Sequence, residues 1–485
     1  MIDMSPEKED KNDIIEELPK KKEKLVDNAK LKTSKKSLIL VGISIILIMV
    51  ALIIILYFIF NTNVSEQNYI KAKFMIRNKD EYIIIFNPSF NDTIEKIKIN
   101  DTQLGKIDYK IKFKELGIAE VELKFNKKLI KLDKFFYNLE TLEEADLSYL
   151  FCDDIESMSD MFNGCKNLKK LTFGDFEPKL INNISNMFSG CENLEEINID
   201  NLIGDKLKDI YGLFFNCSKL KKIEFGEFNS KNIINMSKLF SGCTSLTSIN
   251  LNDAKYFSTE NVVDMSYMFQ NCKNLNNINL NRFDTSKIIN MNNMFDSCEK
   301  LKSLELDNFK TMNVENMIDM FSCCISLSSL NLSNFDTSKV TNMSGIFRNC
   351  TNLNELEINS FKTSLVTDMS EMFRNCYNLE YFNISNFDVK NVKRMFRMFD
   401  SCYSLISLNL SNFETDNLLE ASYFLHECLL LENLDLRKFN TLKLKNYTDF
   451  FQDKPTGVTL IYNKTIFNLS IPKDWNATDI NTDDI

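Results

Sequence analysis

Apolar residues return along most of the chain at a fixed interval, which the cysteines mark most clearly. Successive cysteines are 26 residues apart, except for one interval of 29 residues, in the series Cys165, Cys191, Cys217, Cys243, Cys272, Cys298, Cys324, Cys350, Cys376, Cys402 and Cys428. In the unit that begins at Cys350, apolar side chains stand at Leu353, Leu356, Ile358, Phe361, Val366, Met369, Met372 and Phe373. A fixed period of this length indicates a repeat protein.

Each unit contains two shorter periods. Residues 353–358 have the L-x-x-L-x-L spacing, whose last part alternates as a strand does. Residues 366–376 are apolar at every third or fourth position, which is typical of one helix face, and Thr363 stands where a helix N-cap is expected. A single strand–helix unit cannot bury its apolar face alone, so units must stack. The pattern predicts an α/β fold: a curved solenoid of the leucine-rich-repeat type, with strands inside and helices outside.

The flanks of the repeats predict further segments. Residues 131–454 form the predicted solenoid, whose terminal units lack the cysteine. Residues 61–130 alternate apolar with polar side chains, which favours a small β region serving as a stem or an N-terminal cap. Residues 455–485 are expected to form a C-terminal cap and tail, with a closing strand over 458–462.

An uncharged apolar run covers residues 38–60. As a helix it is long enough to cross a hydrocarbon core of about 30 Å. Lysines gather only before it, at Lys20, Lys21, Lys22, Lys24, Lys30, Lys32, Lys35 and Lys36. This bias predicts a signal-anchor in the plasma membrane, with a disordered cytoplasmic tail over 1–37 and residues 61–485 outside. Binding of these lysines to anionic lipid is a second interpretation, and we favour the topological one.

The repeat units resemble those of a known family. MFRNCYNLEYFNISNFDVKNVKRMF and MFSCCISLSSLNLSNFDTSKVTNMSGIF are similar to the 26-residue repeat of BspA-like surface proteins, over about residues 135–460. This resemblance implies a leucine-rich-repeat fold, a surface location, and adhesion to host or matrix components. The early units depart from the family pattern, because Pro178, Gly204 and Ser230 replace the usual threonine.

Composition narrows the function classes. The net charge of −10 without a basic block in the repeats argues against a nucleic-acid partner. A single histidine, His426, has no second ligand nearby in sequence, so we expect no catalytic residues, no metal and no cofactor. The evenly spaced cysteines invite a disulfide or metal interpretation, but we expect them to be buried core residues. Cys152 and Cys323 lie outside the series and are the better candidates for reactive thiols.

One polar position in each unit is the candidate binding site. It lies between the last two apolar strand positions, so its side chain should point outward on the predicted concave face. The members that we select are Asn279, Glu305, Asn331, Glu357, Asn383 and Asn409. A purely structural ladder of side-chain amides is an equal alternative. Asn331, Asn383 and Asn409 also begin N-x-S sequons and are candidate glycosylation sites.

These expectations lead to a membrane-anchored protein that binds a protein or glycan at the cell surface through its solenoid, as in recognition or adhesion. The alternative is a transmembrane receptor that signals through the short cytoplasmic tail. An ectoenzyme such as a glycosidase is the third hypothesis and the weakest, since repeated carboxylates define no unique pair.

Overall fold

The computed structural model describes residues 42–55, 68–79, 81–202, 204–251 and 254–480, and the chain divides into the units Met1–Gln67 and Asn68–Ile485. In the first unit, residues 42–55 form an α-helix. None of the described helices has the length and apolar character that crossing a membrane requires. This finding contradicts the predicted span over 38–60 and the single-pass plasma-membrane location. The predicted tail over 1–37 and both ends of the predicted span lie outside the described residues.

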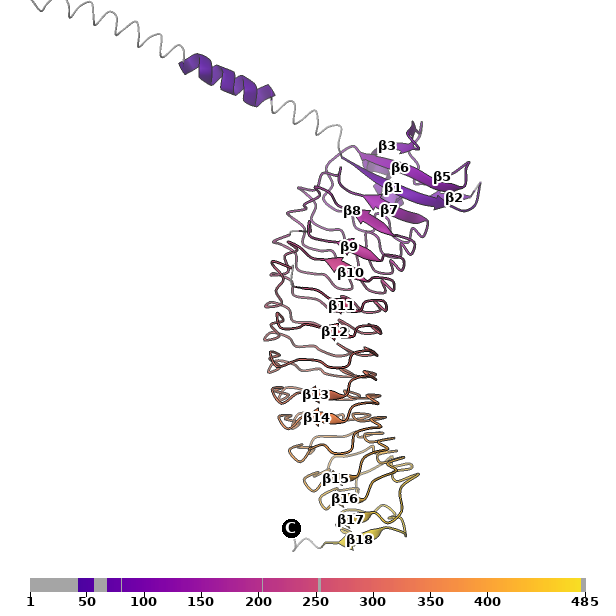
Figure 1. The fold of residues 1–485 in the computed structure, drawn as a ribbon, viewed down its shortest axis with the longest axis vertical. Helices are drawn as coiled ribbons and strands as arrows, with labels where there is room; N and C mark the ends of the chain where they lie inside the picture. The colour runs from indigo at the N-terminus through magenta and orange to yellow at the C-terminus, as the bar shows by residue number, and fades with distance from the viewer. Residues whose placement is uncertain (1–41, 56–67, 80, 203, 252–253, 481–485) are drawn as a thin grey trace, which may run out of the picture. The chain divides into compact units, whose positions relative to one another are not determined.

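The second unit opens with a six-stranded sheet in the order β4-β3-β6-β1-β7-β8 (Figure 1). Long β1 pairs antiparallel with β6 on one side and with β7 on the other. Parallel pairing of β7 with β8 then begins the stack of coils. The elements are β1 (Tyr69–Ile76), β2 (Tyr82–Ile84), the 3-10 helix η1 (Pro88–Thr93), β3 (Ile94–Ile99), β4 (Thr102–Gln103), β5 (Lys110–Lys112), β6 (Gly117–Phe125), β7 (Leu142–Asp146) and β8 (Lys170–Thr172). The β region therefore shares one sheet with the first repeats.

The repeats form successive coils whose short strands stack in parallel (Figure 1). Each of these strands pairs with the strand of an adjacent coil so that equivalent residues lie side by side, as Leu330 lies beside Leu356. The strands are β9 (Glu196–Asn198), β10 (Lys222–Glu224), β11 (Ser248–Ile249), β12 (Asn277–Ile278), β13 (Ser329–Asn331), β14 (Glu355–Glu357), β15 (Ser407–Asn409), β16 (Asn433–Leu436), β17 (Thr459–Tyr462) and β18 (Asn476–Asp479). The predicted strand at 458–462 is confirmed as β17, and β18 pairs with its far side.

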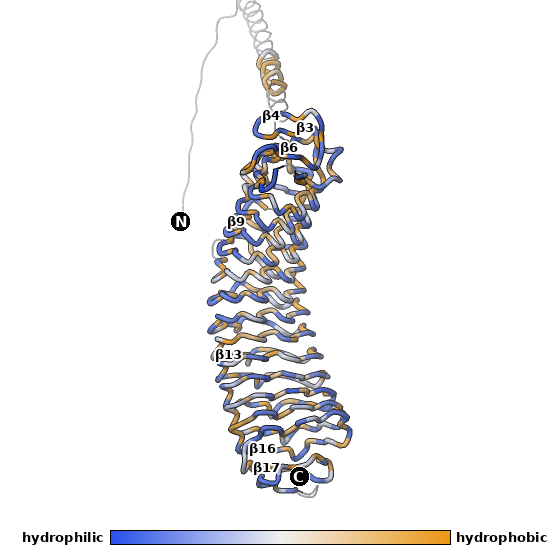
Figure 2. The backbone as a smooth tube through the Cα atoms, turned by 90° about the vertical axis from the view of Figure 1, so that its right-hand side faces the viewer, coloured by the Kyte–Doolittle hydropathy of each residue, from blue (hydrophilic) through white to orange (hydrophobic). Residues whose placement is uncertain are grey.

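Apolar columns fill the inside of the coils, and Figure 2 shows apolar residues returning in coil after coil. Phenylalanine rings stack from one coil to the next; the rings of Phe295 and Phe321 have centroids 5.8 Å apart and are nearly parallel. The regularly spaced cysteines lie in the same core and are buried, as predicted. They are free thiols. Each of them donates from Sγ to the carbonyl of a phenylalanine in the preceding coil, such as Cys350 to Phe321 at 3.1 Å.

The predicted helices on the far side of each coil are wrong. Over residues 366–376 the backbone makes consecutive turns, and Glu371 and Asn375 adopt left-handed conformations with φ near 60°. Alternate N–H groups bond across to the next coil, as Phe373 does to Met398 O at 2.9 Å, whereas an α-helix needs bonds to the residue four before. The fold is therefore a mostly β solenoid rather than an α/β array. Turns with a left-handed residue every fourth position reproduce the apolar spacing of a helix.

The threonine predicted to cap a helix has a different role. Thr337 is buried, its Oγ1 donates to Lys362 O at 2.9 Å, and it accepts from Lys362 N at 2.8 Å. Ser230, which replaces the usual threonine in an early repeat, makes the same two bonds to Ser258. This replacement therefore keeps the hydroxyl group at this position. Gly204 lies so close to the preceding coil that a Cβ would stand 2.4 Å from Ile181 Cγ2. The column joins coils through buried hydroxyl groups.

Candidate functional site: the strand face

The outward positions of the stacked strands form one surface, which we call the strand face. All six selected residues are exposed on it, and the residues on either side of each one are buried or less exposed. Asn331, Glu357 and Asn409 lie within strands, whereas Asn279, Glu305 and Asn383 occupy equivalent positions outside them. Parallel pairing places Asn331 beside Glu357 in adjacent coils. Asn331, Glu357 and Asn383 line one hollow of about 450 Å³, whereas Asn279, Glu305 and Asn409 lie outside it. The structure therefore brings three of the six residues together.

The asparagines of the strand face bond within their own coil. Asn331 Oδ1 accepts the backbone N–H of Ser333 at 3.0 Å, and Asn279 and Asn409 accept equivalent bonds from the residue two positions later. Such bonds are Asx turns, which end each strand. Inter-coil amide bonds occur instead at other asparagines, such as Asn313 Nδ2 to Ser286 O at 2.8 Å. The Oδ1 atoms of Asn279, Asn331 and Asn409 thus serve Asx turns rather than a ladder of side-chain amides, whereas an amide-to-amide bond between coils joins Asn375 Nδ2 to Asn349 Oδ1 at 2.6 Å.

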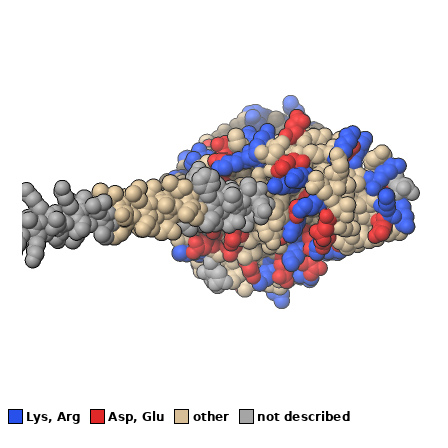
Figure 3. All heavy atoms as spheres, turned by 90° about the horizontal axis from the view of Figure 1, so that it is seen from above, with Lys and Arg blue, Asp and Glu red and all other residues tan. Residues whose placement is uncertain are grey.

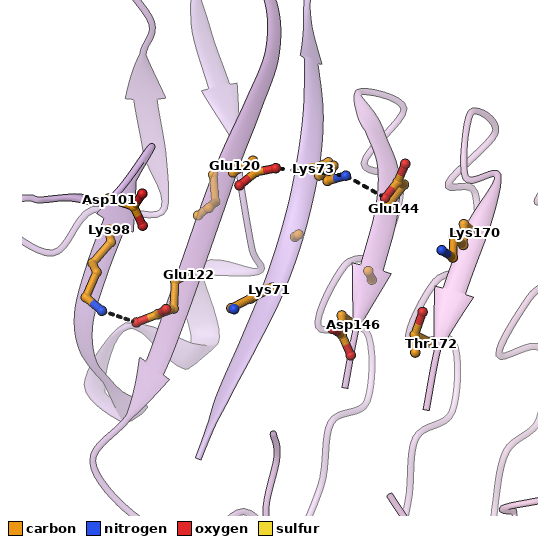
Figure 4. Close-up of a pocket in the computed structure, with 13 residues that line it drawn as sticks. Lys71, Lys73, Lys98, Asp101, Glu120, Glu122, Glu144, Asp146, Lys170 and Thr172 are labelled. Atoms are coloured by element: carbon orange, nitrogen blue, oxygen red, sulfur yellow. Dashed lines mark ion pairs between the residues drawn. The ribbon is translucent and has the colours of Figure 1, made fainter. Parts of the chain in front are cut away.

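Charged side chains at the N-terminal end of the strand face neutralise one another. Lys98 Nζ on β3 lies 2.6 Å from Glu122 on β6, and Lys73 Nζ on β1 lies 3.0 Å from Glu144 on β7 (Figure 4). Lys71 lies over the ring of Tyr149, 4.8 Å from its centroid. These lysines and glutamates line a hollow of about 350 Å³. Seen from this end, cationic and anionic side chains are interspersed on the surface (Figure 3).

The same pairing continues through the next coils. Lys169 Nζ lies 3.0 Å from Glu143, and Lys221 Nζ lies 2.8 Å from Glu195, each between equivalent positions 26 residues apart. Surface pairs such as Lys221–Glu195 contribute little to stability. Their main effect here is to leave little uncompensated charge on this part of the strand face.

Around β14 the strand face carries carboxylates that are not paired with lysines in the described part of the chain. Glu355 and Glu357 are both exposed there, and Tyr381 of the next coil is 59% exposed. All three line the 450 Å³ hollow with Asn331 and Asn383. No ion pair with a described residue engages these carboxylates. The hollow therefore combines uncompensated negative charge, side-chain amides and an aromatic ring.

Glu355 and Tyr381 were missed in the sequence. We selected one outward position per strand, but residues two apart in a strand share a face. The signal for Glu355 was therefore present two positions before Glu357. Tyr381 occupies the position equivalent to Glu355 one coil later, and an aromatic residue at an outward strand position is a signal of the same kind.

A second cluster of titratable groups lies on the turn side, the side of each coil that is formed by consecutive turns, as over residues 366–376. The Asp400 side chain is almost fully buried and accepts bonds from Arg374 at 3.2 Å, Arg397 at 2.9 Å and His426 Nδ1 at 2.7 Å. Asp400, His426 and Glu427 hold ligand atoms within 4.8 Å of one another. Two guanidinium groups already neutralise Asp400, and their charge opposes a cation there. His426 contacts Asp400 of the preceding coil and, at 3.6 Å from Nε2, Asp453 of the following coil, so these partners are about one repeat away in sequence.

The buried thiols are poor nucleophiles, because they stay protonated at neutral pH. Burial raises the pKa of Cys165 and Cys376 to about 12, because the thiolate would lose its solvation. Cys323 is partly exposed and accepts a bond from Asn349 Nδ2 at 3.1 Å. Cys152, the other cysteine outside the series, is buried. Thiol chemistry is therefore confined to the partly exposed Cys323 among the cysteines.

Comparison with known proteins gives one extensive match. The family model described as "Mycoplasma protein of unknown function, DUF285" matches residues 130–251, 246–355, 343–459 and 383–482. No curated protein matches the chain.

Solved structures give distant similarities. "Crystal structure of TLR13-ssRNA13 complex" has 14% identity and a TM-score of 0.25, covering 69% of this chain and 48% of that one. The Toll–Spatzle complex from Drosophila has 17% identity and a TM-score of 0.20, covering 64% and 51%. A leucine-rich repeat protein from Eubacterium ventriosum has 12% identity and a TM-score of 0.23, covering 49% and 77%. The chain thus spans about half the length of the first two.

Proposed function

The chain belongs to the DUF285 family, whose model matches it from residue 130 to residue 482, and we propose that it is a recognition protein that binds a macromolecular partner on its strand face. The observation that carries this proposal is the hollow beside β14, where Glu355, Glu357 and Tyr381 are exposed without internal ionic partners. A long repeated surface suits many weak contacts with an extended or multivalent partner.

The finer part of the proposal is adhesion to host or matrix components, with a protein or glycan as the partner. Its support is the resemblance of the units to the BspA-like repeat. We assign the chain no catalytic role, because the titratable cluster around Asp400 is engaged in internal ion pairs. The receptor alternative required the membrane span and gains no support from the described helix.

A binding assay with the purified full chain tests this proposal. Host cells and matrix proteins are presented to the immobilised chain, and capture is compared between the native chain and an Asn331→Arg/Asn383→Arg variant. The bulky charged side chains should obstruct the hollow and reduce capture at least about tenfold. The control is Leu365→Arg, at a position on the turn side that is 50% exposed. Equal capture by the native chain and the strand-face variant would overturn the proposal.

A further inference from the structure

The chemistry around β14 defines a partner more narrowly. We propose that the hollow beside β14 binds an extended polypeptide segment that carries lysine or arginine at alternate positions. This inference rests on the proposed function and specifies the partner at the same surface. Three independent observations support it: the charge balance of the strand face, the spacing of its carboxylates, and the exposed ring of Tyr381.

The charge balance differs between the two ends of the strand face at equivalent positions. Glu144 and Glu196 occupy the position of Glu355 in earlier coils, and each is followed one coil later by a lysine, Lys170 and Lys222. Glu144 pairs with Lys73 at 3.0 Å, and Lys222 pairs with Glu224 at 2.5 Å. At the position where a lysine would follow Glu355, the next coil has Tyr381. The exposed carboxylates without a described ionic partner on this part of the face are Glu305, Glu355, Glu357, Glu380 and Glu432.

Cations of the same coils are held elsewhere. Arg348, Arg374 and Arg397 belong to the turn-side ion pairs, and Lys362 pairs with Asp336 at 3.1 Å. Lys302 is exposed two coils before β14, so the uncompensated negative charge belongs to Glu355, Glu357 and Glu380 beside the hollow. A cationic partner supplies the charge that internal lysines supply in the first coils, and opposite charge also speeds the encounter.

The spacing of the carboxylates fits an extended segment. Glu355 and Glu357 lie two residues apart on β14 and point to the same side, so their backbones are separated by about 6.6 Å. Side chains at alternate positions of an extended peptide have the same spacing. A peptide lying along β14 can therefore place one cation at each carboxylate, which two adjacent lysines cannot do because they point to opposite sides.

Tyr381 adds a contact that suits the same partner. Its ring is exposed and lines the hollow with Glu355 and Glu357. A lysine or arginine over a tyrosine ring gains about 0.5–1 kcal/mol at an exposed site. The chain already uses this contact internally, since Lys71 lies 4.8 Å from the ring centroid of Tyr149. Asn331 and Asn383 provide amide groups at the two sides of the hollow.

The test uses the full chain and fluorescently labelled peptides in anisotropy titrations. One peptide has lysine at alternate positions, a second has the same composition with the lysines contiguous, and a third has glutamate at the alternate positions. We expect the first to bind most tightly, the third not to bind, and affinity to fall with added salt. The Glu355→Gln/Glu357→Gln variant should lose at least about tenfold in affinity, or about 1.4 kcal/mol.

Glu224→Gln is the matched control, because Glu224 occupies the position of Glu357 in an earlier coil and already pairs with Lys222, and it should leave peptide affinity unchanged. The inference is overturned if no basic peptide binds at low salt, if contiguous and alternate lysines bind equally, or if the control loses as much affinity as the double variant. If peptides fail to bind while Asn331→Arg/Asn383→Arg still abolishes capture, the strand face is functional and its partner has another chemistry.

Discussion

Asn383 accepts two hydrogen bonds from Ser385 through the same Oδ1 atom: the backbone N–H lies at 3.0 Å and the hydroxyl at 2.7 Å. This pair is also an N-x-S sequon. The geometry supplies a structural reason for the motif, because an Asx turn needs the asparagine oxygen and gains from a hydroxyl two residues later. The motif therefore recurs in the repeats whether or not it carries glycan.

Asn383→Asp and Asn383→Ala separate the two roles of this asparagine. Aspartate keeps the acceptor oxygen and removes the glycosylation acceptor, so stability should stay within about 0.5 kcal/mol of the native chain. Alanine removes the turn bond and should lower the free energy of unfolding by about 0.5–1.5 kcal/mol. Denaturant unfolding measures both, and a glycosidase mobility shift reports glycan. Equal destabilisation by both variants would contradict the structural role.

Thr337→Val removes a buried hydroxyl that bonds both backbone groups of Lys362. The change is nearly isosteric, but it leaves a buried donor and acceptor unpaired. We expect a loss of about 1–3 kcal/mol in the free energy of unfolding, measured by denaturant titration. The chain offers a matched control, since Val389 already interrupts this column and is buried. Val389→Thr should be neutral or stabilising, and a comparable loss there would argue against the hydroxyl column.

Native thiols should differ sharply in their reaction with an alkylating reagent. Cys323 is partly exposed and should react first, while the regularly spaced cysteines are buried with strongly raised pKa values, as at Cys217 and Cys272 near 12. Since the thiolate is the nucleophile, they should react only after unfolding. Mass spectrometry of peptides from labelled native and urea-treated protein measures this. Rapid native labelling of Cys217 would contradict the buried column.

Asp319 makes stability depend on pH. Burial raises the pKa of its carboxyl from 3.8 to about 6, despite the opposing charge of Arg348, with smaller upward contributions from Asp296 and Glu371. The folded protein therefore holds a proton between these pH values that the unfolded chain has lost. Stability should fall as pH rises from about 4 to 6, by about 2–3 kcal/mol.

The Asp319→Asn variant tests this relation, because asparagine cannot ionise. Relative to the variant, the native chain should lose stability between pH 4 and pH 6.5 and change little above that range. Urea midpoints for both proteins across this pH range give the difference. Parallel profiles for the two proteins would show that Asp319 titrates near its ordinary value.

The sequence predicted which residues are buried better than which backbone conformation buries them. Val366, Met369, Phe373 and Cys376 are all in the core, as their spacing indicated. Helix and consecutive turns give the same apolar spacing, and the deciding feature is the left-handed conformation of residues such as Glu371, which glutamate does not signal. Similarly, a threonine at the position of Thr363 is compatible both with a helix N-cap and with a buried hydroxyl group that bonds to the next coil.

The strand face was predictable in part. Alternation along a strand placed Asn331, Glu357 and Asn383 outward, and they are exposed. The hollow beside β14 could not be predicted from single positions, because it depends on which neighbouring coil lacks a lysine. The partners of His426 were hidden for the same reason, since a contact between adjacent coils joins residues about one repeat apart.

The coil between Cys243 and Cys272 is three residues longer than the others, yet Asn235 still bridges to Asp264 and Val263 N still donates to Ile234 O at 2.9 Å. Bonding between neighbours thus follows equivalent places in each turn of the chain rather than a fixed count. Whole modules can be duplicated or lost, and corners can be widened, without redesigning the interior. A change in the number of repeats in the gene would then lengthen or shorten the solenoid by whole coils. The surface side chains of the remaining coils would stay the same.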